Sequence, residues 1–189
     1  DAIAYRVKLL KILSDSKSSI CDTKQRDIAD LFFDFFTNEY EAADEDAPKG
    51  RQKLLISHLQ VLAKFTNPRC VTRGKELRKL YIELLQHRNF QVQKLALDCI
   101  LHYKEPGVVN YKEILLNCVN EKTFRQEIIS LNLNEKVEGE LREGFSEIFL
   151  PILYSKLTVK AGKNDQEGFK NKKEVIVRFM NHLKEEELS

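Results

Sequence analysis

The fold is decided by the stretch LRKLYIELLQHRNFQVQKLALDCIL, which covers residues 77–101. Each half carries apolar residues at helical spacing, and a short polar turn separates the two halves. Asn89 lies in that turn and can cap the second helix by accepting a hydrogen bond from a free backbone N–H. The inward stripes are predicted to contain Leu77, Leu80, Tyr81, Leu84 and Leu85 in the first helix, and Val92, Leu95, Ala96, Cys99 and Ile100 in the second.

A single helix pair of this kind cannot bury both of its stripes. Ala96 and Cys99 are small, so the two helices can approach each other closely. Stacking of similar pairs is the usual way to cover the remaining apolar surface. The sequence therefore predicts an all-α fold, a HEAT/armadillo-like helical-repeat solenoid of stacked antiparallel helix pairs. Such a fold normally presents a binding surface rather than a reaction centre.

The composition fits this class. Hydrophobic residues make up 42% and charged residues 32% of the 189 residues, and no run of about 18 apolar residues predicts a membrane span. A net charge of +2 excludes a strong general attraction to nucleic acid. Four cysteines without a C-x-x-C pair argue against a zinc knuckle and favour a reducing compartment. The chain does not begin with Met, and we expect it to be a piece of a longer protein.

The remaining sequence predicts helices on both sides of the central pair. We divide it into N-terminal helices (1–66), central helix pairs (67–134) and C-terminal helices with a basic loop at 156–173 (135–189). Pro151 should kink or restart its helix, and Asn110 and Thr123 can cap helices. In the second helix, 23–40, the inner face should include Leu31. Further helices are expected at 2–13, 49–65, 111–119, 124–131, 137–157 and 171–188, with connecting loops at 41–48 and 158–173.

Motifs that would indicate an enzyme are missing from the sequence: it has no P-loop, G-x-G-x-x-G, G-x-S-x-G or H-E-x-x-H. We predict no catalytic, cofactor-binding or metal-binding residues. Cys99 and His102 are three residues apart and could supply two metal ligands or a thiol with its base. A core cysteine beside a boundary histidine is the favoured interpretation, because no further ligand lies nearby in sequence. His87 could act as a catalyst or pH sensor, but a hydrogen bond within its turn is favoured.

Basic residues near the C-terminus are the best candidates for contact with RNA or a partner protein. Lysines in a flexible loop can neutralise phosphates without reading base sequence. The alternative is a solvated linker, because Asp165 and Glu167 dilute the charge. A weaker cluster formed by Arg69, Arg73, Lys75, Arg78 and Lys79 is interpreted as a solubilising surface. The candidate contact residues are Lys156, Lys160, Lys163, Lys170, Lys172, Lys173 and Arg178.

Three segments together resemble a known family. They are LYIELLQHRNFQVQKLALDCIL at 80–101, YKEIL at 111–115 followed by FRQE at 124–127, and ILY at 152–154 followed by a basic loop, 175–179 and a terminal EEL. In this order they resemble the very large HEAT-repeat proteins of the small-subunit processome, also called the down-regulated-in-metastasis family. The resemblance covers about residues 77–188, and the N-terminal third is placed by continuity.

The resemblance implies a scaffold of the nucleolus and nucleus that acts in pre-rRNA processing and small ribosomal subunit biogenesis. Its implied partners are other processome proteins and pre-rRNA or snoRNA, with no cofactor, membrane or small-molecule substrate. The chain departs from the family at Ser155-Lys156, where Gly-Arg is usual, and at Lys172-Lys173-Glu174, where paired Arg is usual. Lysine keeps the charge but loses the forked geometry of arginine.

Two other classes of protein remain as alternatives. One is a helical-repeat transport adaptor or regulator that binds peptide segments in its groove. A ladder of Asn or Trp along the inner helices would be typical of that class, and the chain has no Trp. The other is an enzyme that uses Cys99 and His102.

Overall fold

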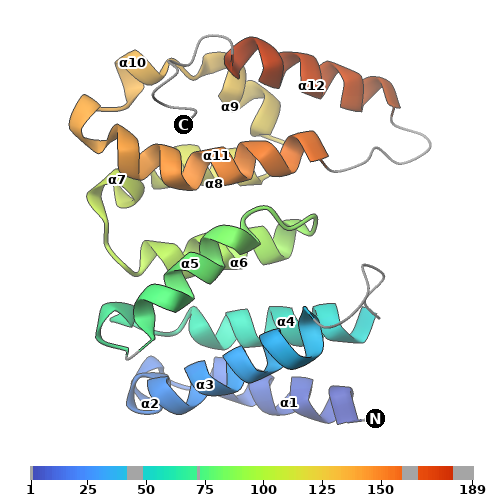
Figure 1. The fold of residues 1–189 in the computed structure, drawn as a ribbon, viewed down its shortest axis with the longest axis vertical. Helices are drawn as coiled ribbons and strands as arrows, with labels where there is room; N and C mark the ends of the chain where they lie inside the picture. Colours follow the sequence, from blue (N-terminus) through green and yellow to red (C-terminus); the bar gives the residue numbers. More distant parts are fainter. Residues whose placement is uncertain (1, 42–48, 72, 159–165, 181–189) are drawn as a thin grey trace. The chain divides into compact units, whose positions relative to one another are not determined.

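A computed structural model describes residues 2–41, 49–71, 73–158 and 166–180, with α12 side chains described from residue 173 onward. Over these ranges the regular structure is helical and contains no strand, so the predicted all-α helical-repeat class is confirmed. The elements are α1 Ala2–Asp15, α2 Ser18–Thr23, α3 Gln25–Phe35, the π-helical turn η1 Phe36–Tyr40, α4 Lys49–Leu62, η2 Pro68–Cys70, α5 Gly74–Leu84, α6 Phe90–Leu101, α7 Pro106–Val109, α8 Lys112–Val119, α9 Phe124–Ser130, α10 Leu133–Lys136, η3 Gly139–Leu141, α11 Arg142–Thr158 and α12 Gln166–Met180 (Figure 1).

The chain forms two compact units. Unit 1 contains Asp1–Tyr81 and Leu95–Tyr103, and unit 2 contains Ile82–Lys94 and Lys104–Ser189. The division passes through α5 and α6, so each of these helices contributes to both units. The three-part division into 1–66, 67–134 and 135–189 stays a prediction.

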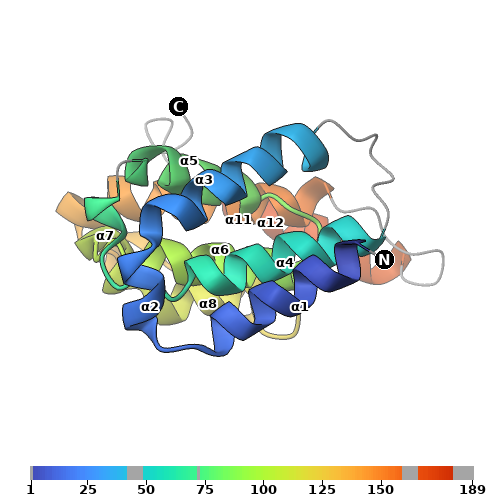
Figure 2. The same ribbon diagram turned by 90° about the horizontal axis from the view of Figure 1, so that it is seen from below.

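Unit 1 is organised around α1 and α4, which lie side by side (Figures 1 and 2). Leu10 is the buried residue of α1, while Phe32 and Phe35 of α3 are completely buried. The predicted inward position of Leu31 is wrong, because its side chain is 49% exposed. The helix begins only at Gln25, and Ala29 takes the inward place beside Phe32.

The helix pair predicted from residues 77–101 is present as α5 and α6, and its predicted inward residues are buried except for Leu95, which is half-buried. The Asn89 side-chain oxygen accepts hydrogen bonds from the backbone N–H of Gln91 at 2.7 Å and of Val92 at 3.4 Å, so the predicted cap is present. The predicted cap at Asn110 is wrong, because Tyr111 precedes α8. Thr123 does precede α9 as predicted, but its hydroxyl donates to a backbone carbonyl instead of accepting from an N–H.

Unit 2 is organised around α11, which packs against α7, α8 and α12 (Figure 1). Of the two outcomes predicted at Pro151, a restart is wrong, because α11 continues through it with Ile148 and Ile152 buried on either side, and a kink stays a prediction. Burial of this stripe sustains the helix although proline removes one backbone hydrogen bond. The predicted loop is shorter than expected, since α12 begins at Gln166. Predicted features at 42–48, 159–165 and 181–188 lie outside the described residues.

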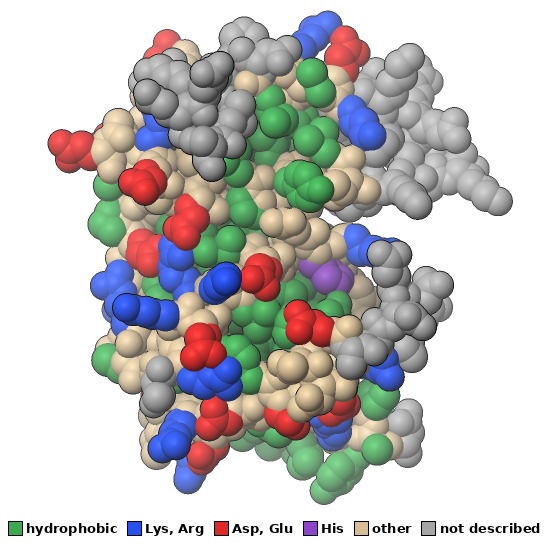
Figure 3. Space-filling model, in the orientation of Figure 1, with side chains coloured by type: hydrophobic (Ala, Val, Ile, Leu, Met, Phe, Trp, Pro, Cys, Tyr) green, Lys and Arg blue, Asp and Glu red, His purple; other side chains and the backbone are tan. Residues whose placement is uncertain are grey.

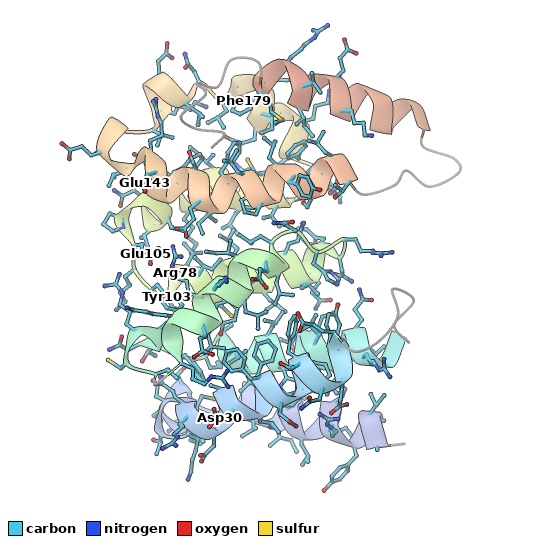
Figure 4. The ribbon with its side chains drawn as sticks, in the orientation of Figure 1. Asp30, Arg78, Tyr103, Glu105, Glu143 and Phe179 are labelled. Atoms are coloured by element: carbon cyan, nitrogen blue, oxygen red, sulfur yellow. The ribbon has the colours of Figure 1, made fainter. Side chains whose placement is uncertain are left out.

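Two contacts show how closely unit 2 is packed. A Cβ at Gly107 would lie 2.9 Å from the carbonyl oxygen of Leu141 and 3.1 Å from Cα of Gly144, so α7 meets the start of α11 where only glycine fits. Phe149 of α11 meets Phe179 edge-on at 5.7 Å between ring centroids. Figure 4 shows Phe179 extending from α12 toward α11. Aromatic pairs at such distances add to the stability gained by burial.

Candidate interface residues

Lys156 is buried instead of lying in an exposed loop. It belongs to the last turn of α11, and its residue is 1% exposed. Its ammonium group donates to the backbone carbonyl of Val119 at 2.7 Å and to the carboxylate of Glu121 at 2.5 Å. The prediction that Lys156 is available to RNA from the surface is therefore wrong. The physical reason is its position, one turn after Ile152 on the inward stripe.

A buried polar network surrounds this ammonium group within unit 2. The Gln93 amide donates to the carbonyl of Leu85 at 2.9 Å and to the hydroxyl of Ser155 at 2.7 Å. The Ser155 hydroxyl in turn donates to a backbone carbonyl of α11 at 2.6 Å. Val119 is the last residue of α8, where free carbonyl groups carry partial negative charge and favour a cation. The network is therefore a structural junction between α6, α8 and α11.

Sequence reasoning missed the partners in this junction. The position of Lys156 on the α11 stripe was the signal that could have revealed its burial. Gln93 follows the buried Val92 in α6, and a polar residue there gives no sequence signal of its own. Glu121 lies in the turn after α8, and nothing in its local sequence distinguishes it from a solvated carboxylate.

The remaining predicted contact residues are only partly described. Lys160 and Lys163 lie outside the described residues, and Lys170 and Lys172 belong to α12 without described side chains. Lys173 is exposed. The guanidinium group of Arg178 forms an exposed ion pair with Glu174, one helical turn away, at 2.7 Å. Contact of these residues with RNA or a partner stays a prediction.

The second basic cluster is interspersed with acidic residues. Arg73 forms ion pairs with Glu76 at 2.7 Å and with Asp30 at 3.8 Å, and its guanidinium carbon lies 3.6 Å from the ring centroid of Phe33. Figure 3 shows basic and acidic side chains intermixed over α3 and α5. This arrangement fits the predicted solubilising surface better than a binding site for a polyanion.

Cys99 is poorly suited to nucleophilic chemistry. Its thiol lies 3.8 Å from the carbonyl oxygen of Leu59, and burial raises its pKa far above the ordinary value for cysteine. The thiolate that would attack a substrate or bind a metal is therefore disfavoured. Within the ranges described, no group of three His, Cys, Asp or Glu side chains could hold a metal ion.

The four cysteines should differ sharply in their reactivity toward an alkylating reagent. Cys70 is exposed, whereas Cys21, Cys99 and Cys118 are buried. Burial also raises the pKa of Cys118 to about 12. Brief treatment of the folded protein with iodoacetamide should therefore add one label, which peptide mass spectrometry will locate at Cys70. Labelling of Cys99 at a comparable rate in the folded state would contradict its packing.

His87 hydrogen-bonds its turn, as the favoured interpretation predicted. Its Nδ1 accepts a hydrogen bond from the backbone N–H of Asn89 at 2.9 Å. Burial lowers its pKa, and the nearby charge of Arg88 acts in the same direction. The neutral ring that makes this hydrogen bond is therefore favoured.

His58 is a buried titratable group that sequence reasoning did not single out. It is 2% exposed and stacks on Phe35 at 4.8 Å between ring centroids. Its Nε2 has no hydrogen-bond partner among the described residues. Burial lowers the pKa of His58 to about 4, with a further lowering from Arg6 and an opposing effect from Glu39. The structure therefore holds this imidazole neutral.

Protonation of His58 should destabilise the protein in mild acid. The unfolded chain binds the proton near pH 6.5 and the folded chain only near pH 4. Above pH 6.5 the neutral His58 therefore causes no loss of stability. As the pH falls from 6.5 to 4, the free energy of unfolding should decrease by about 3 kcal/mol. Urea unfolding of the wild type and of His58→Phe across this range will test the effect, because only the wild type carries the group. Parallel pH profiles for the two proteins would contradict it.

The described helices include none that is both long and apolar enough to cross a membrane. The fold defines the chain as a segment of a helical-repeat protein. Its buried polar side chains, among them Lys156, Cys99 and His58, pack between the helices. Residues 49–189 match the model of the family described as U3 small nucleolar RNA-associated protein 20, N-terminal, and the chain belongs to this family. The resemblance found in the sequence is therefore confirmed.

Two curated relatives give the same family assignment. The U3 small nucleolar RNA-associated protein 20 of Saccharomyces cerevisiae is 30% identical over 119 residues, which is 63% of this chain. The protein of the same name from Schizosaccharomyces pombe is 25% identical over 134 residues, or 69% of this chain. The match covers 5% of the length of each relative.

Proposed function

We propose that this chain is a non-enzymatic segment of a helical-repeat scaffold in the small-subunit processome. It would support pre-rRNA processing and small ribosomal subunit biogenesis in the nucleolus. The observation that carries the proposal is the family match over residues 49–189, together with relatives named for association with U3 small nucleolar RNA. The match covers only 5% of each relative, so the role of the whole protein is proposed here together with the role of this segment.

The mechanism is positional: packed helices hold exposed side chains in fixed places, where other processome proteins and pre-rRNA or snoRNA can dock. Lys156 has an internal role in this mechanism, because its ammonium group is directed at Val119 and Glu121. Docking would therefore fall to the exposed residues of α12, such as Lys173 and Arg178, and to the lysines that precede them. The buried, protonated thiol of Cys99 supports the non-enzymatic part of the proposal.

A charge-reversal experiment in the full-length protein tests the docking surface. Glutamate would replace Lys170, Lys172 and Lys173 in one variant, and the exposed Arg69, Lys75 and Lys79 in a matched control. We expect the first variant to lower the amount of U3 small nucleolar RNA that co-purifies, and the control to change it less than about twofold. Equal recovery with both variants would reject the α12 region as a contact surface.

Depletion of the full-length protein tests the broader function. We expect precursors of the small-subunit rRNA to accumulate, while precursors specific to the large subunit are processed normally. Re-expression of the wild-type protein should restore processing. Normal small-subunit processing after depletion would reject the proposed function itself, whatever the result of the charge-reversal experiment.

A further inference from the structure

The helix α1 has a second apolar face that nothing in the described structure covers. Its inner face packs against α4 through Leu10, with Ile3 and Val7 half-buried. Tyr5, Leu9 and Ile12 lie away from that face and are 65%, 45% and 66% exposed. Figure 3 shows hydrophobic side chains gathered along the edge formed by α1.

The spacing of these three side chains is that of a helix-packing stripe. Tyr5, Leu9 and Ile12 stand at i, i+4 and i+7, so they align along one side of α1. A helix that is apolar on two opposite sides is normally buried on both. Other exposed apolar side chains, such as Ile129 at 65% exposure, do not belong to a stripe of this kind.

We propose that the face formed by Tyr5, Leu9 and Ile12 docks an amphipathic helix from a further helix pair of the same polypeptide. In helical-repeat proteins each pair buries its outer stripe against the next pair. The curated relatives are long enough for many such pairs, since this chain matches 5% of their length. The inference stands apart from the processome role, because it depends on the α1 face alone.

Charge beside the stripe indicates the chemistry of the docking helix. The exposed Lys8 borders the apolar stripe, three residues after Tyr5 and four before Ile12, and Lys11 follows one turn later on the same flank of α1, before Asp15 at its last residue. The matching helix should carry Asp or Glu beside its own apolar stripe, opposite these lysines. On this account the α1 face is an internal packing surface of the longer protein and is not free for RNA or separate proteins.

Site-specific photo-crosslinking in the full-length protein tests this proposal. Ile12 would be replaced by benzoylphenylalanine, and Ile129, which is almost equally exposed in this structure, would carry the same probe as a control. We expect illumination to join residue 12 to a helix outside residues 1–189 of the same polypeptide, without adding the mass of another chain. Crosslinking to a second copy, to a different protein, or no more than at residue 129 would overturn the proposal.

A packing variant supplies a second readout that does not depend on the probe. Serine would replace Tyr5, Leu9 and Ile12 together, and the melting temperature of the 189-residue chain should remain within about 3 °C of wild type, because these side chains are already exposed. In the full-length protein the same changes should speed proteolytic cleavage near α1 several-fold. An unchanged cleavage rate there would contradict the docking of α1.

Discussion

Replacing Ala96 with glutamate is expected to lower the free energy of unfolding by about 4 kcal/mol or more, enough to unfold a protein of ordinary stability. Ala96 is completely buried in α6, and Val92 and Ile100, one helical turn away on either side, are completely buried too. A carboxylate at this position would lose its hydration without gaining a cation. Its larger volume would also force neighbouring side chains apart.

Urea unfolding followed by circular dichroism will measure this loss. The matched control is Gln91→Glu, which places the same carboxylate at an exposed position in the first turn of α6, where the helix dipole favours it. We expect the control to change stability by less than about 0.5 kcal/mol. A similarly small change for Ala96→Glu would mean that Ala96 does not face the core.

Replacing Lys156 with alanine should produce the second largest effect, a loss of about 3 kcal/mol. The change removes the aliphatic part of a buried side chain and leaves the carbonyl of Val119 without its charged donor. Glu121 reduces the penalty because its side chain is 55% exposed and can be hydrated. Lys156→Met keeps most of the volume, and we expect it to lose about half as much stability.

Denaturant unfolding at low and high salt separates this internal role from a surface role. Because the ammonium group is buried, the loss in Lys156→Ala should persist at about 1 M salt. The control Lys173→Ala removes an exposed lysine and should change stability by less than about 0.5 kcal/mol. If Lys156→Ala were as stable as this control, the buried network would not contribute to folding.

Hydrophobic periodicity predicted the inward stripe of α5 well, because that helix is buried along one side. In α6 it placed the half-buried Leu95 inward and missed the buried Gln93 and Leu97. The same reasoning failed at Leu31, which lies at the edge of the stripe formed by the buried Ile28, Ala29, Phe32 and Phe35. The restart considered at Pro151 also did not occur, because burial along the whole of α11 outweighs the local preference of proline to interrupt a helix. Local patterns thus determine the elements, while tertiary packing decides details at their ends and interruptions.

The candidate contact residues were harder to predict than the fold. Lysine is normally exposed, so residue type suggested a surface position for Lys156 even though its spacing placed it on the buried stripe. Its acceptors come from residues far away in sequence, Val119 and Glu121, and no local pattern connects them. The family could be recognised from short sequence segments. The role of Lys156 could be recognised only from the residues that surround it in the fold.

The polar junction around Lys156 also restricts how α11 can be aligned along its neighbours. Apolar side chains recur each turn along this helix, so after a slip of one turn, about 5.4 Å, apolar side chains would still face apolar neighbours, although Gly144 would leave its close approach to Gly107. The same slip would carry the ammonium group away from Val119 and separate Ser155 from Gln93, leaving buried polar atoms without acceptors or donors. Only one register of α11 satisfies both kinds of contact, and the junction thereby selects a single packing of unit 2.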